Sequence, residues 1–390
     1  MDKHKRIAII GAGPGGLTLA RILQQAGFHP EIFEGETSAT QREQGGTLDL
    51  AEDMGQTALK VAGLLEQFKE ICRYEGEALK IMDKTATALH EYGSSENPEA
   101  VTDSRPEIDR TVLRHMLLDA VNPEAIKWGH KLLYATSLEN GQHELHFENG
   151  VTEIVDLVVG ADGAFSKLRP LVSKETAEYS GVSMIEINIL DAKNQFPDMV
   201  ELNGLGSAFS LDDSKAMLAQ MNGDGKIRVY LSFKVPVEWL HNNGINYDNL
   251  GEAKTELLKL FEDWSPKLKN YIHYANGPIF PRRIYMLPVG HKWEHKKGIT
   301  LLGDAAHLMS PFAGAGANLA MLDAAELALS IINHDDIDEA VHKYELKMFK
   351  YAGEMSSITK KYMDLFFETN AAEKIKELMK SFHKEENQKA

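Results

Sequence analysis

Cysteine is almost absent from this sequence. Cys72 is the only one in 390 residues, so no disulfide can form within the chain and no metal site can be built from several thiolates. A protein without disulfides suits a reducing compartment. We therefore expect a cytoplasmic protein without a cysteine-based metal site.

Long apolar runs are also lacking. No stretch approaches the roughly 18 apolar residues that a membrane span requires. The charged residues 1–6 lead into a short apolar segment, which the glycine-rich residues 11–16 interrupt before a signal-peptide core could form. These absences predict a protein that has no membrane partner.

Positive charge is scarce. The chain has 42 Lys and Arg residues against 58 Asp and Glu residues, which gives a formal net charge of −16 at pH 7. A field of this sign repels nucleic acids and anionic lipids, so neither class is an expected partner. The hydrophobic fraction of 43% and the charged fraction of 26% are ordinary for a soluble globular protein.

The N-terminal sequence follows the order of a nucleotide-binding unit. Residues 6–10 are apolar and rich in β-branched side chains, and residues 11–16 read Gly-Ala-Gly-Pro-Gly-Gly. A helix is predicted over 17–26, followed by a second strand over 30–34 that ends in an acid. Strand, glycine turn, helix, strand and acid together indicate a dinucleotide site.

Each residue of this motif has a physical role. Gly11 permits a tight turn, Gly13 lets a pyrophosphate approach the backbone, and Gly16 allows close packing of helix and strand. Gly15 belongs to the same loop, at a helix N-terminus that favours phosphate. Glu34 stands 18 residues after Gly16, near the spacing of an acid that binds ribose hydroxyls. Because an acid repels a 2′-phosphate, the tightly held nucleotide is FAD or NAD rather than NADP.

Two further motifs follow apolar segments downstream. Residues 156–160 lead into Gly-Ala-Asp-Gly at 160–163, and this motif continues to Arg169. Residues 298–302 lead into Gly-Asp-Ala-Ala-His at 303–307. The last motif continues with Pro311, Gly314, Gly316 and Asn318.

In this order and at this spacing, the three motifs resemble those of the flavoprotein aromatic hydroxylases, the group A FAD-dependent monooxygenases. The resemblance extends over about residues 5–350. It implies an α/β fold: a Rossmann-type FAD-binding domain with an inserted β-sheet substrate domain and a C-terminal helix. It also implies FAD as the cofactor and NADPH as a transient co-substrate.

The resemblance carries roles to matching residues. It implies that Asp304 contacts the ribityl hydroxyls of FAD. The start of a helix at 314–318, with Pro311 before it, would face the flavin ring and stabilise negative charge on it. Asp162 would contact FAD and NADPH, or else serve as a turn and cap. His307 is expected to be structural rather than a catalytic base.

Further segments narrow the resemblance to the tetracycline-inactivating flavin monooxygenases, which confer antibiotic resistance. These segments are Gln-Gly-Gly-Thr-Leu-Asp-Leu at 44–50, residues 106–114, residues 231–239 and residues 308–314. By this resemblance, Asp49 and Arg114 contact FAD, and Arg42 contacts NADPH through a guanidinium fork suited to phosphate. Arg110 is a second basic candidate near the flavin; Arg110 and Arg114 could instead form a solvated helix face.

The expected substrate pocket departs from that family. Where the tetracycline enzymes present a glutamine, an arginine and a histidine, this sequence has Glu186, Gly206 and Arg228. Glu186 and Arg228 could pair with each other or bind a different polar substrate. Met217 and Phe312 are further pocket candidates, although apolar residues more often belong to a core.

The length indicates two domains. We expect a discontinuous FAD-binding domain made of residues 1–75, 100–175 and 280–335, a substrate domain over 176–280, and a C-terminal helical region over 336–390. Within the substrate domain, strands are predicted at 182–190, 207–211, 215–220 and 226–234.

The resemblance implies a monooxygenase that hydroxylates a small aromatic or polycyclic substrate, such as tetracycline. NADPH would reduce FAD, and a C4a-hydroperoxyflavin formed with O2 would deliver one oxygen atom. No catalytic side chain and no metal is needed, and we expect a monomer. Two alternatives stay open: a flavin-dependent dehydrogenase, reductase or halogenase of the same fold, and a non-catalytic FAD-binding protein that sequesters a drug.

Overall fold

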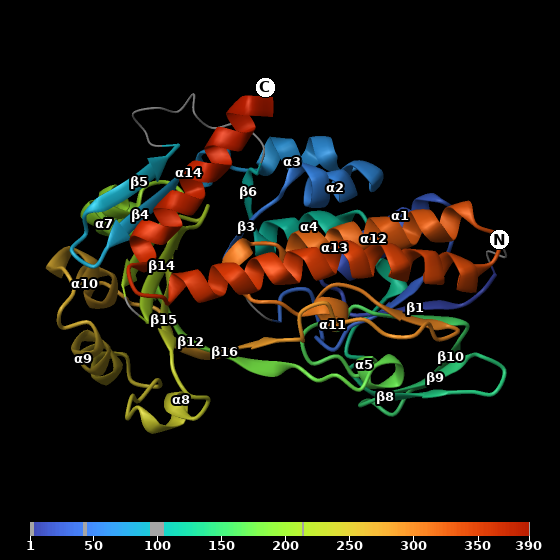
Figure 1. Cartoon of the computed structure of the whole chain (residues 1–390). Coiled ribbons are helices and arrows are strands. Elements are labelled where there is room, and N and C mark those ends of the chain that lie inside the picture. The colour runs from blue at the N-terminus through green and yellow to red at the C-terminus, as the bar shows by residue number, and fades with distance from the viewer. Residues whose placement is uncertain (1–3, 42–44, 94–104, 213, 390) are drawn as a thin grey trace. The chain divides into compact units, whose positions relative to one another are not determined.

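The computed structural model describes residues 4–41, 45–93, 105–212 and 214–389 (Figure 1). The chain forms two compact units, and each is assembled from three segments. The first unit contains Met1–Cys72, Arg110–Glu178 and Tyr285–Lys360, and the second contains Arg73–Asp109, Tyr179–Ile284 and Lys361–Ala390. Among the described residues, no helix has both the length and the apolar character needed to cross a membrane.

A parallel five-stranded sheet organises the first unit, with strand order β17-β11-β1-β2-β7. Its strands are β1 (Ile7–Ile10), β2 (Glu31–Phe33), β7 (Ile126–Lys127), β11 (Leu157–Gly160) and β17 (Ile299–Leu301). All residues of β1, β11 and β17 are buried, which is typical of parallel strands covered on both faces. The predicted α/β fold with a Rossmann-type FAD-binding domain is therefore confirmed.

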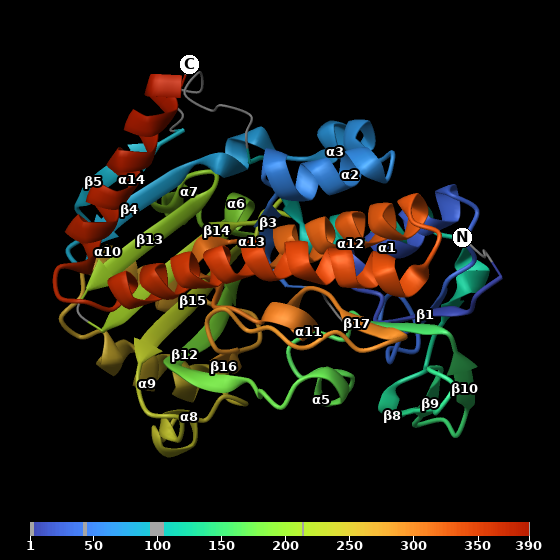
Figure 2. The same ribbon diagram turned by 45° about the vertical axis from the view of Figure 1, so that its right-hand side comes forward.

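Helices cover this sheet. Helices α1 (Pro14–Gln25) and α12 (Gly316–Asn333) lie side by side in both views (Figures 1 and 2). A small antiparallel sheet of order β10-β9-β8 is inserted between β7 and β11. The remaining elements are β3 (Thr47–Asp49), α2 (Thr57–Val61), α3 (Leu65–Ile71), α4 (Arg110–Asp119), β8 (Leu132–Ser137), β9 (His143–Phe147), β10 (Thr152–Val155), α5 (Arg169–Val172), α11 (Asp304–His307) and most of α13 (Ile337–Phe366).

A seven-stranded sheet organises the second unit, with order β16-β12-β15-β14-β13-β4-β5. Its strands are β4 (Leu79–Asp83), β5 (Ala88–Tyr92), β12 (Glu178–Ile189), β13 (Ser207–Asp212), β14 (Lys215–Met221), β15 (Ile227–Lys234) and β16 (Phe280–Met286). The four strands predicted for the substrate domain are confirmed as β12 to β15. These four form antiparallel pairs, whereas β13 runs parallel to β4.

The two faces of this sheet differ in polarity. Ile185, Ile187 and Leu231 point to one face and form a hydrophobic core with Phe261 and Trp264. Alternate residues of a strand point to opposite sides, so Glu186, Asn188 and Arg228 lie on the other face. That face is therefore polar. The helices of this unit are α6 (Ala192–Gln195), α7 (Pro197–Asn203), α8 (Trp239–Asn242), α9 (Leu250–Leu260), α10 (Pro266–His273) and α14 (Ala371–Lys389); α14 packs on β4, β5 and β13.

The core of the second unit yields a stability prediction. Leu257 on α9 is fully buried in it. Leu257→Ala should lower the free energy of unfolding by about 2–5 kcal/mol, because it removes buried methyl groups and leaves a cavity. Lys259→Ala, two residues further on an exposed face, is the control and should cost less than about 1 kcal/mol. Equal losses in urea denaturation would contradict this placement of Leu257.

Candidate functional site

The glycine-rich loop between β1 and α1 is shaped by close backbone contacts. Gly11 has a φ of +112°, and a Cβ on it would lie 2.4 Å from the carbonyl oxygen of Ala161. A Cβ on Gly16 would lie 2.1 Å from the Gly11 oxygen. A Cβ on Gly15 would lie 2.8 Å from the oxygen of Ala320. Glycine is therefore required at these three positions by the protein itself.

Gly13 differs from the other glycines of the loop. A Cβ on Gly13 would meet no atom within 4 Å, and its backbone is extended, with φ −81° and ψ 177°. Nothing within the protein therefore requires glycine at this position. The open space lies at the N-terminus of α1, where free N–H groups and the helix dipole favour an anion. A pyrophosphate lying against the backbone fits both observations.

Glu34 is held beside this loop. It follows the end of β2, and its Oε2 accepts a hydrogen bond from Ala12 N–H at 2.7 Å. Its Oε1 accepts a second bond from Glu36 N–H at 2.9 Å. These bonds orient the carboxylate, and each oxygen retains a lone pair for another donor. The acid that the sequence spacing singled out thus lies at the glycine loop.

Arg114 on α4 contacts the same loop from the interior of the protein. Its guanidinium is buried and forms a 2.8 Å ion pair with Glu36. It also donates to the backbone oxygens of Ala12 (3.3 Å) and Ala39 (3.2 Å). The alternative of a solvated helix face is therefore wrong for Arg114, because its guanidinium is buried and contacts the glycine loop and the segment after β2.

Arg110 and Arg42 were the other basic candidates. Arg110 lies against Gly45, where a Cβ would come within 3.0 Å of the Arg110 Cδ. The positive charge of Arg110 acts on the Asp304 carboxyl and favours its ionised form. Arg42 lies outside the described residues.

The second motif forms a turn that Asp162 caps. Its Oδ2 accepts a hydrogen bond from Lys167 N–H at 2.7 Å. Its Oδ1 is buried and has no hydrogen-bond partner among the described residues. Burial raises the pKa of Asp162, although hydrogen bonds from Ser166 and the backbone oppose that rise. The turn is thus one role of Asp162, and its Oδ1 remains a buried acceptor without a donor among the described residues.

Arg169, the last residue of the second motif, was not assigned a role from the sequence. Its buried guanidinium donates to the carbonyl oxygens of Ala164 (2.9 Å), Asp304 (2.9 Å) and Ala305 (2.8 Å). Arg169 therefore ties the second motif to the third. The only signal in the sequence was its place at the end of the motif.

Two acids face the start of α12. Asp304 begins α11 directly after β17, and a Cβ on Gly316 would lie 3.8 Å from its Oδ1. Asp49 ends β3, and a Cβ on Gly314 would lie 3.0 Å from its Oδ1. Burial raises the pKa of Asp304, while the charges of His307, Arg110 and Arg169 oppose this. The sequence-predicted residues of the third motif thus converge on one helix N-terminus, together with the turn that Pro311 begins.

Asn318 fixes that helix start. Its Oδ1 accepts hydrogen bonds from Ala51 N–H (2.9 Å) and Gly55 N–H (3.2 Å). Its Nδ2 donates to the oxygens of Asp49 (2.7 Å) and Gly314 (3.3 Å). The side chain of this buried residue is fully engaged with the backbone, so Asn318 acts on a bound ligand through the loop it positions.

Beneath the third motif lies a buried network that sequence reasoning missed. The Asp323 carboxylate is fully buried and accepts from His307 Nε2 (2.6 Å), Gly303 N–H (2.7 Å) and the Tyr351 hydroxyl (2.6 Å). Burial opposes an imidazolium, but the Asp323 and Asp304 charges outweigh it, so the pKa of His307 lies above its ordinary value. This network supports the expectation that His307 is structural.

On the polar face of the seven-stranded sheet, Glu186 lies between two arginines. Its Oε2 accepts from Arg282 Nε at 2.7 Å and lies 2.7 Å from Arg282 Nη2. Its Oε1 lies 3.4 Å from Arg228 Nη1. The Glu186 and Arg228 side chains are 3% and 5% exposed, whereas Arg282 is 50% exposed. The predicted Glu186–Arg228 pair is confirmed, and Arg282 is an addition that the sequence did not indicate.

The two apolar pocket candidates are not brought together with this cluster. Met217 is fully buried in the hydrophobic core, on the face of the sheet opposite Glu186, because it pairs with the core residue Leu231. Met217 is therefore a core residue rather than a companion of Glu186 and Arg228. Phe312 belongs to the first unit, in the short turn of residues 311–313 before α12.

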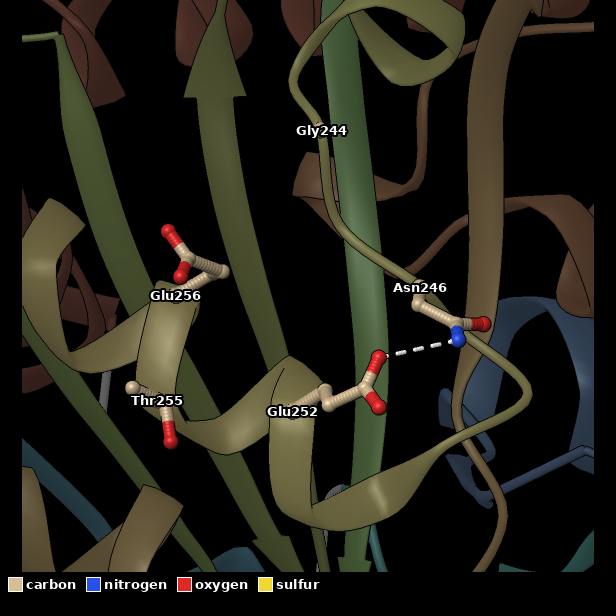
Figure 3. Close-up of a pocket in the computed structure, with 5 residues that line it drawn as sticks. All are labelled: Gly244, Asn246, Glu252, Thr255 and Glu256. Atoms are coloured by element: carbon tan, nitrogen blue, oxygen red, sulfur yellow. Dashed lines mark hydrogen bonds between the residues drawn. The ribbon is translucent and has the colours of Figure 1, made fainter.

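A surface hollow of about 230 Å³ lies elsewhere in the second unit (Figure 3). It is lined by Gly244, Asn246, Glu252, Thr255 and Glu256. Glu252 accepts hydrogen bonds from Asn246 (3.0 Å) and from the helix-capping Asn249 (2.8 Å). These contacts form the cap of α9, and the hollow offers no group that would hold a flavin.

The glycine loop, its acid, and two further acids at a second helix start define a dinucleotide-binding flavoprotein. Residues 4–334 match the family described as FAD binding domain, and the chain belongs to that family. The monooxygenase asqM of Emericella nidulans is 32% identical over 444 residues, covering 96% of this chain and 98% of asqM. The chain is an FAD-dependent monooxygenase.

Solved structures share the fold at lower identity. Klebsiella pneumoniae HpxO complexed with FAD and uric acid has a TM-score of 0.76 and 19% identity, covering 97% of this chain and 92% of HpxO. The tetracycline destructase Tet(55) has a TM-score of 0.68 and 22% identity, covering 92% of this chain and 90% of Tet(55). These neighbours differ in the compounds that their names mention, so the similarity does not identify the substrate of this chain.

The contrast between two loop glycines can be tested. Gly13→Ala should leave the thermal stability of the apoprotein unchanged but raise the dissociation constant of FAD about tenfold or more, because the methyl group enters ligand space. Gly16→Ala should destabilise the apoprotein, because its Cβ would meet the Gly11 oxygen at 2.1 Å. Flavin titration and melting curves measure both effects. Unchanged FAD affinity in Gly13→Ala would argue against a nucleotide at this loop.

The Asp323–His307 pair should produce a pH-dependent stability. Since the pKa of His307 is raised in the folded state, its contribution is complete below the unfolded value of about 6.5 and is lost as pH rises through the folded value. The stability difference between wild type and Asp323→Asn should therefore shrink as pH rises from the ordinary histidine value of 6.5 through the raised folded value. His307 should also stay protonated at higher pH in the wild type, as histidine NMR would show. A difference that is independent of pH would contradict a charged pair.

Proposed function

We propose that this monooxygenase consumes NADPH and O2 to hydroxylate a small aromatic or polycyclic substrate that carries an acidic oxygen. The supporting observation is the Glu186 cluster, in which the guanidinium groups of Arg228 and Arg282 flank one carboxylate on the polar face of the sheet, and the Arg282 side chain is 50% exposed. An exposed guanidinium favours a phenolate, an enolate or a carboxylate.

The residues of the first unit are suited to hold FAD. The loop with Gly13 would receive the pyrophosphate, and Glu34 would bind the ribose hydroxyls. Asp304 would accept from the ribityl chain, and the N-terminus of α12 would face the ring system and favour negative charge on it. When bound, FAD supplies hydride acceptance and the activation of O2.

The resemblance of the sequence to the aromatic hydroxylases supports NADPH as the reductant. By the resemblance, Arg42 would bind the 2′-phosphate through its guanidinium, and Asp162 of the second motif would make a further contact. The reaction balances as substrate, O2, NADPH and one proton giving hydroxylated substrate, NADP⁺ and water.

Tetracycline fits this chain less well than a smaller substrate. Gly206 stands where the tetracycline enzymes present an arginine, and a Cβ there would lie 2.1 Å from the oxygen of Ala78 and 2.4 Å from that of Gly76. No side chain enters this position unless the backbone moves. Glu186 and Arg228 also change the charge that a ligand would meet.

The test is turnover by purified, FAD-loaded protein under air, with acidic phenols, urate and tetracycline as candidate substrates. A substrate should accelerate NADPH oxidation and gain one atom from isotopically labelled O2, without equivalent release of hydrogen peroxide. A flavin reductase or dehydrogenase would oxidise NADPH or substrate without inserting oxygen. A sequestering protein would bind the compound and leave NADPH consumption unchanged.

The charge of the Glu186 cluster predicts two opposite effects. Arg282→Gln should raise KM for an acidic substrate about tenfold, because it removes the half-exposed guanidinium that would pair with the substrate. Glu186→Gln should lower KM for the same compound, because it removes a carboxylate that repels an anion. FAD content should not change in either variant.

Arg283→Gln is the matched control. Arg283 is the next residue on β16 and donates to the oxygen of Val237 instead of Glu186. It should have the wild-type KM. Equal effects of Arg282→Gln and Arg283→Gln would overturn the assignment of Arg282.

A further inference from the structure

A second cluster of chemically reactive side chains lies in the first unit, outside the nucleotide motifs. It consists of His295, His342 and Glu345, each of which offers one possible ligand atom, and these atoms lie within 4.8 Å of one another. His295 precedes β17, and the other two residues belong to α13. No role in flavin chemistry accounts for this group.

The carboxylate of Glu345 is the buried centre of the cluster. Its Oε2 accepts from His295 Nδ1 at 2.7 Å. Its Oε1 accepts from Trp293 Nε1 (3.1 Å) and from the Thr300 hydroxyl (2.9 Å). The side chain is 1% exposed, so its orientation is fixed by neighbours on two other segments.

Helical spacing brings three side chains that can bind a metal ion to the same side of α13. Asp338, His342 and Glu345 are separated by four and three residues, so they share one helix face. The His342 and His295 rings lie 4.9 Å apart with a 54° tilt. His342 is exposed, so the cluster is open to water on this side.

The far side of the His295 ring also meets a carboxylate. His295 Nε2 lies 3.3 Å from Asp338 Oδ1, and that nitrogen has no hydrogen-bond partner in the described part of the chain. In metal sites a ligating histidine is commonly oriented by a carboxylate on its other nitrogen, and a ligating carboxylate is itself hydrogen-bonded. Asp338 is in position for the first role, and Trp293 and Thr300 for the second.

The charge balance also favours a cation. Glu345 and Asp338 each have His295 as their ion-pair partner, and neither pairs with a Lys or Arg among the described residues. A single imidazole, at most singly charged, thus stands between two carboxylates, one of them buried. A divalent ion would neutralise both.

We propose that His295 Nδ1, one imidazole nitrogen of His342 and Glu345 Oε2 bind a divalent transition-metal ion, with water at the fourth position. Two imidazoles and a carboxylate, without thiolate, suit Zn²⁺, and also Co²⁺ or Ni²⁺, rather than Ca²⁺ or Mg²⁺. The ion replaces the proton that His295 Nδ1 now donates to Glu345, and the neutral ring then carries its proton on Nε2, where Asp338 can accept it. The site joins the segment before β17 to α13.

The experiment uses untagged, FAD-loaded protein that has been freed of metal by EDTA dialysis. Titration calorimetry with Zn²⁺ should give one site per chain. Saturating Zn²⁺ should raise the melting temperature, because an ion that binds only the folded state stabilises it. Absence of a stoichiometric site, or binding that leaves the melting temperature unchanged, would overturn the proposal.

Two variants locate the site. His342→Ala should weaken Zn²⁺ binding about tenfold or more while leaving the metal-free melting temperature unchanged, because this side chain is exposed. Glu345→Gln should weaken binding while an amide retains an oxygen for Trp293 and Thr300. His115→Ala, at an exposed histidine on α4, is the matched control and should bind as the wild type does. Wild-type affinity in His342→Ala, or an equal loss in His115→Ala, would contradict the assignment.

Discussion

The buried Asp323 carboxylate is the interaction on which the flavin-binding unit depends. A fully buried charge must be neutralised and hydrogen-bonded, and here His307, the Gly303 amide and the Tyr351 hydroxyl do both. These contacts fix the turn after β17, and that turn determines where Asp304 can point. The position of Asp304, the acid expected at the ribityl chain, thus depends on the Asp323–His307 pair. Asp323 lies on α12, whose N-terminus is proposed to face the flavin.

Backbone proximity is the second constraint, and it separates two reasons for glycine. Gly11, Gly15 and Gly16 are glycine because the chain packs against itself, whereas Gly13 is glycine where the protein leaves space. The same motif therefore contains three glycines that the packing of the protein requires and one, Gly13, that is proposed to make room for a ligand. The structure supports the division of roles that the motif predicts, through what surrounds each α-carbon.

Sequence alone predicted the features that depend on local spacing. The strand, loop, helix and acid order placed Glu34 beside the glycine loop, and the strands predicted within residues 182–234 correspond to β12 to β15. It could not predict contacts across long separations: Arg282 meets Glu186 across 96 residues, and nothing near either residue indicates this. Met217 is a second example. Its apolar character fits both a pocket and a core, and only its register with Leu231 shows that it faces the core. The strand order, with β4 beside β13, is equally non-local.

Gly206 has a consequence for how substrate range can change in this lineage. Its α-carbon is enclosed by the carbonyls of Gly76 and Ala78, so every single replacement at this position meets backbone before it meets a ligand. An arginine at 206 would first require the segment leading into β4 to shift, which several coordinated changes would have to accomplish together. With the substrate at the Glu186 cluster, as proposed, evolution or laboratory selection toward larger substrates would proceed more readily through Arg282, whose half-exposed side chain can be exchanged without moving the chain.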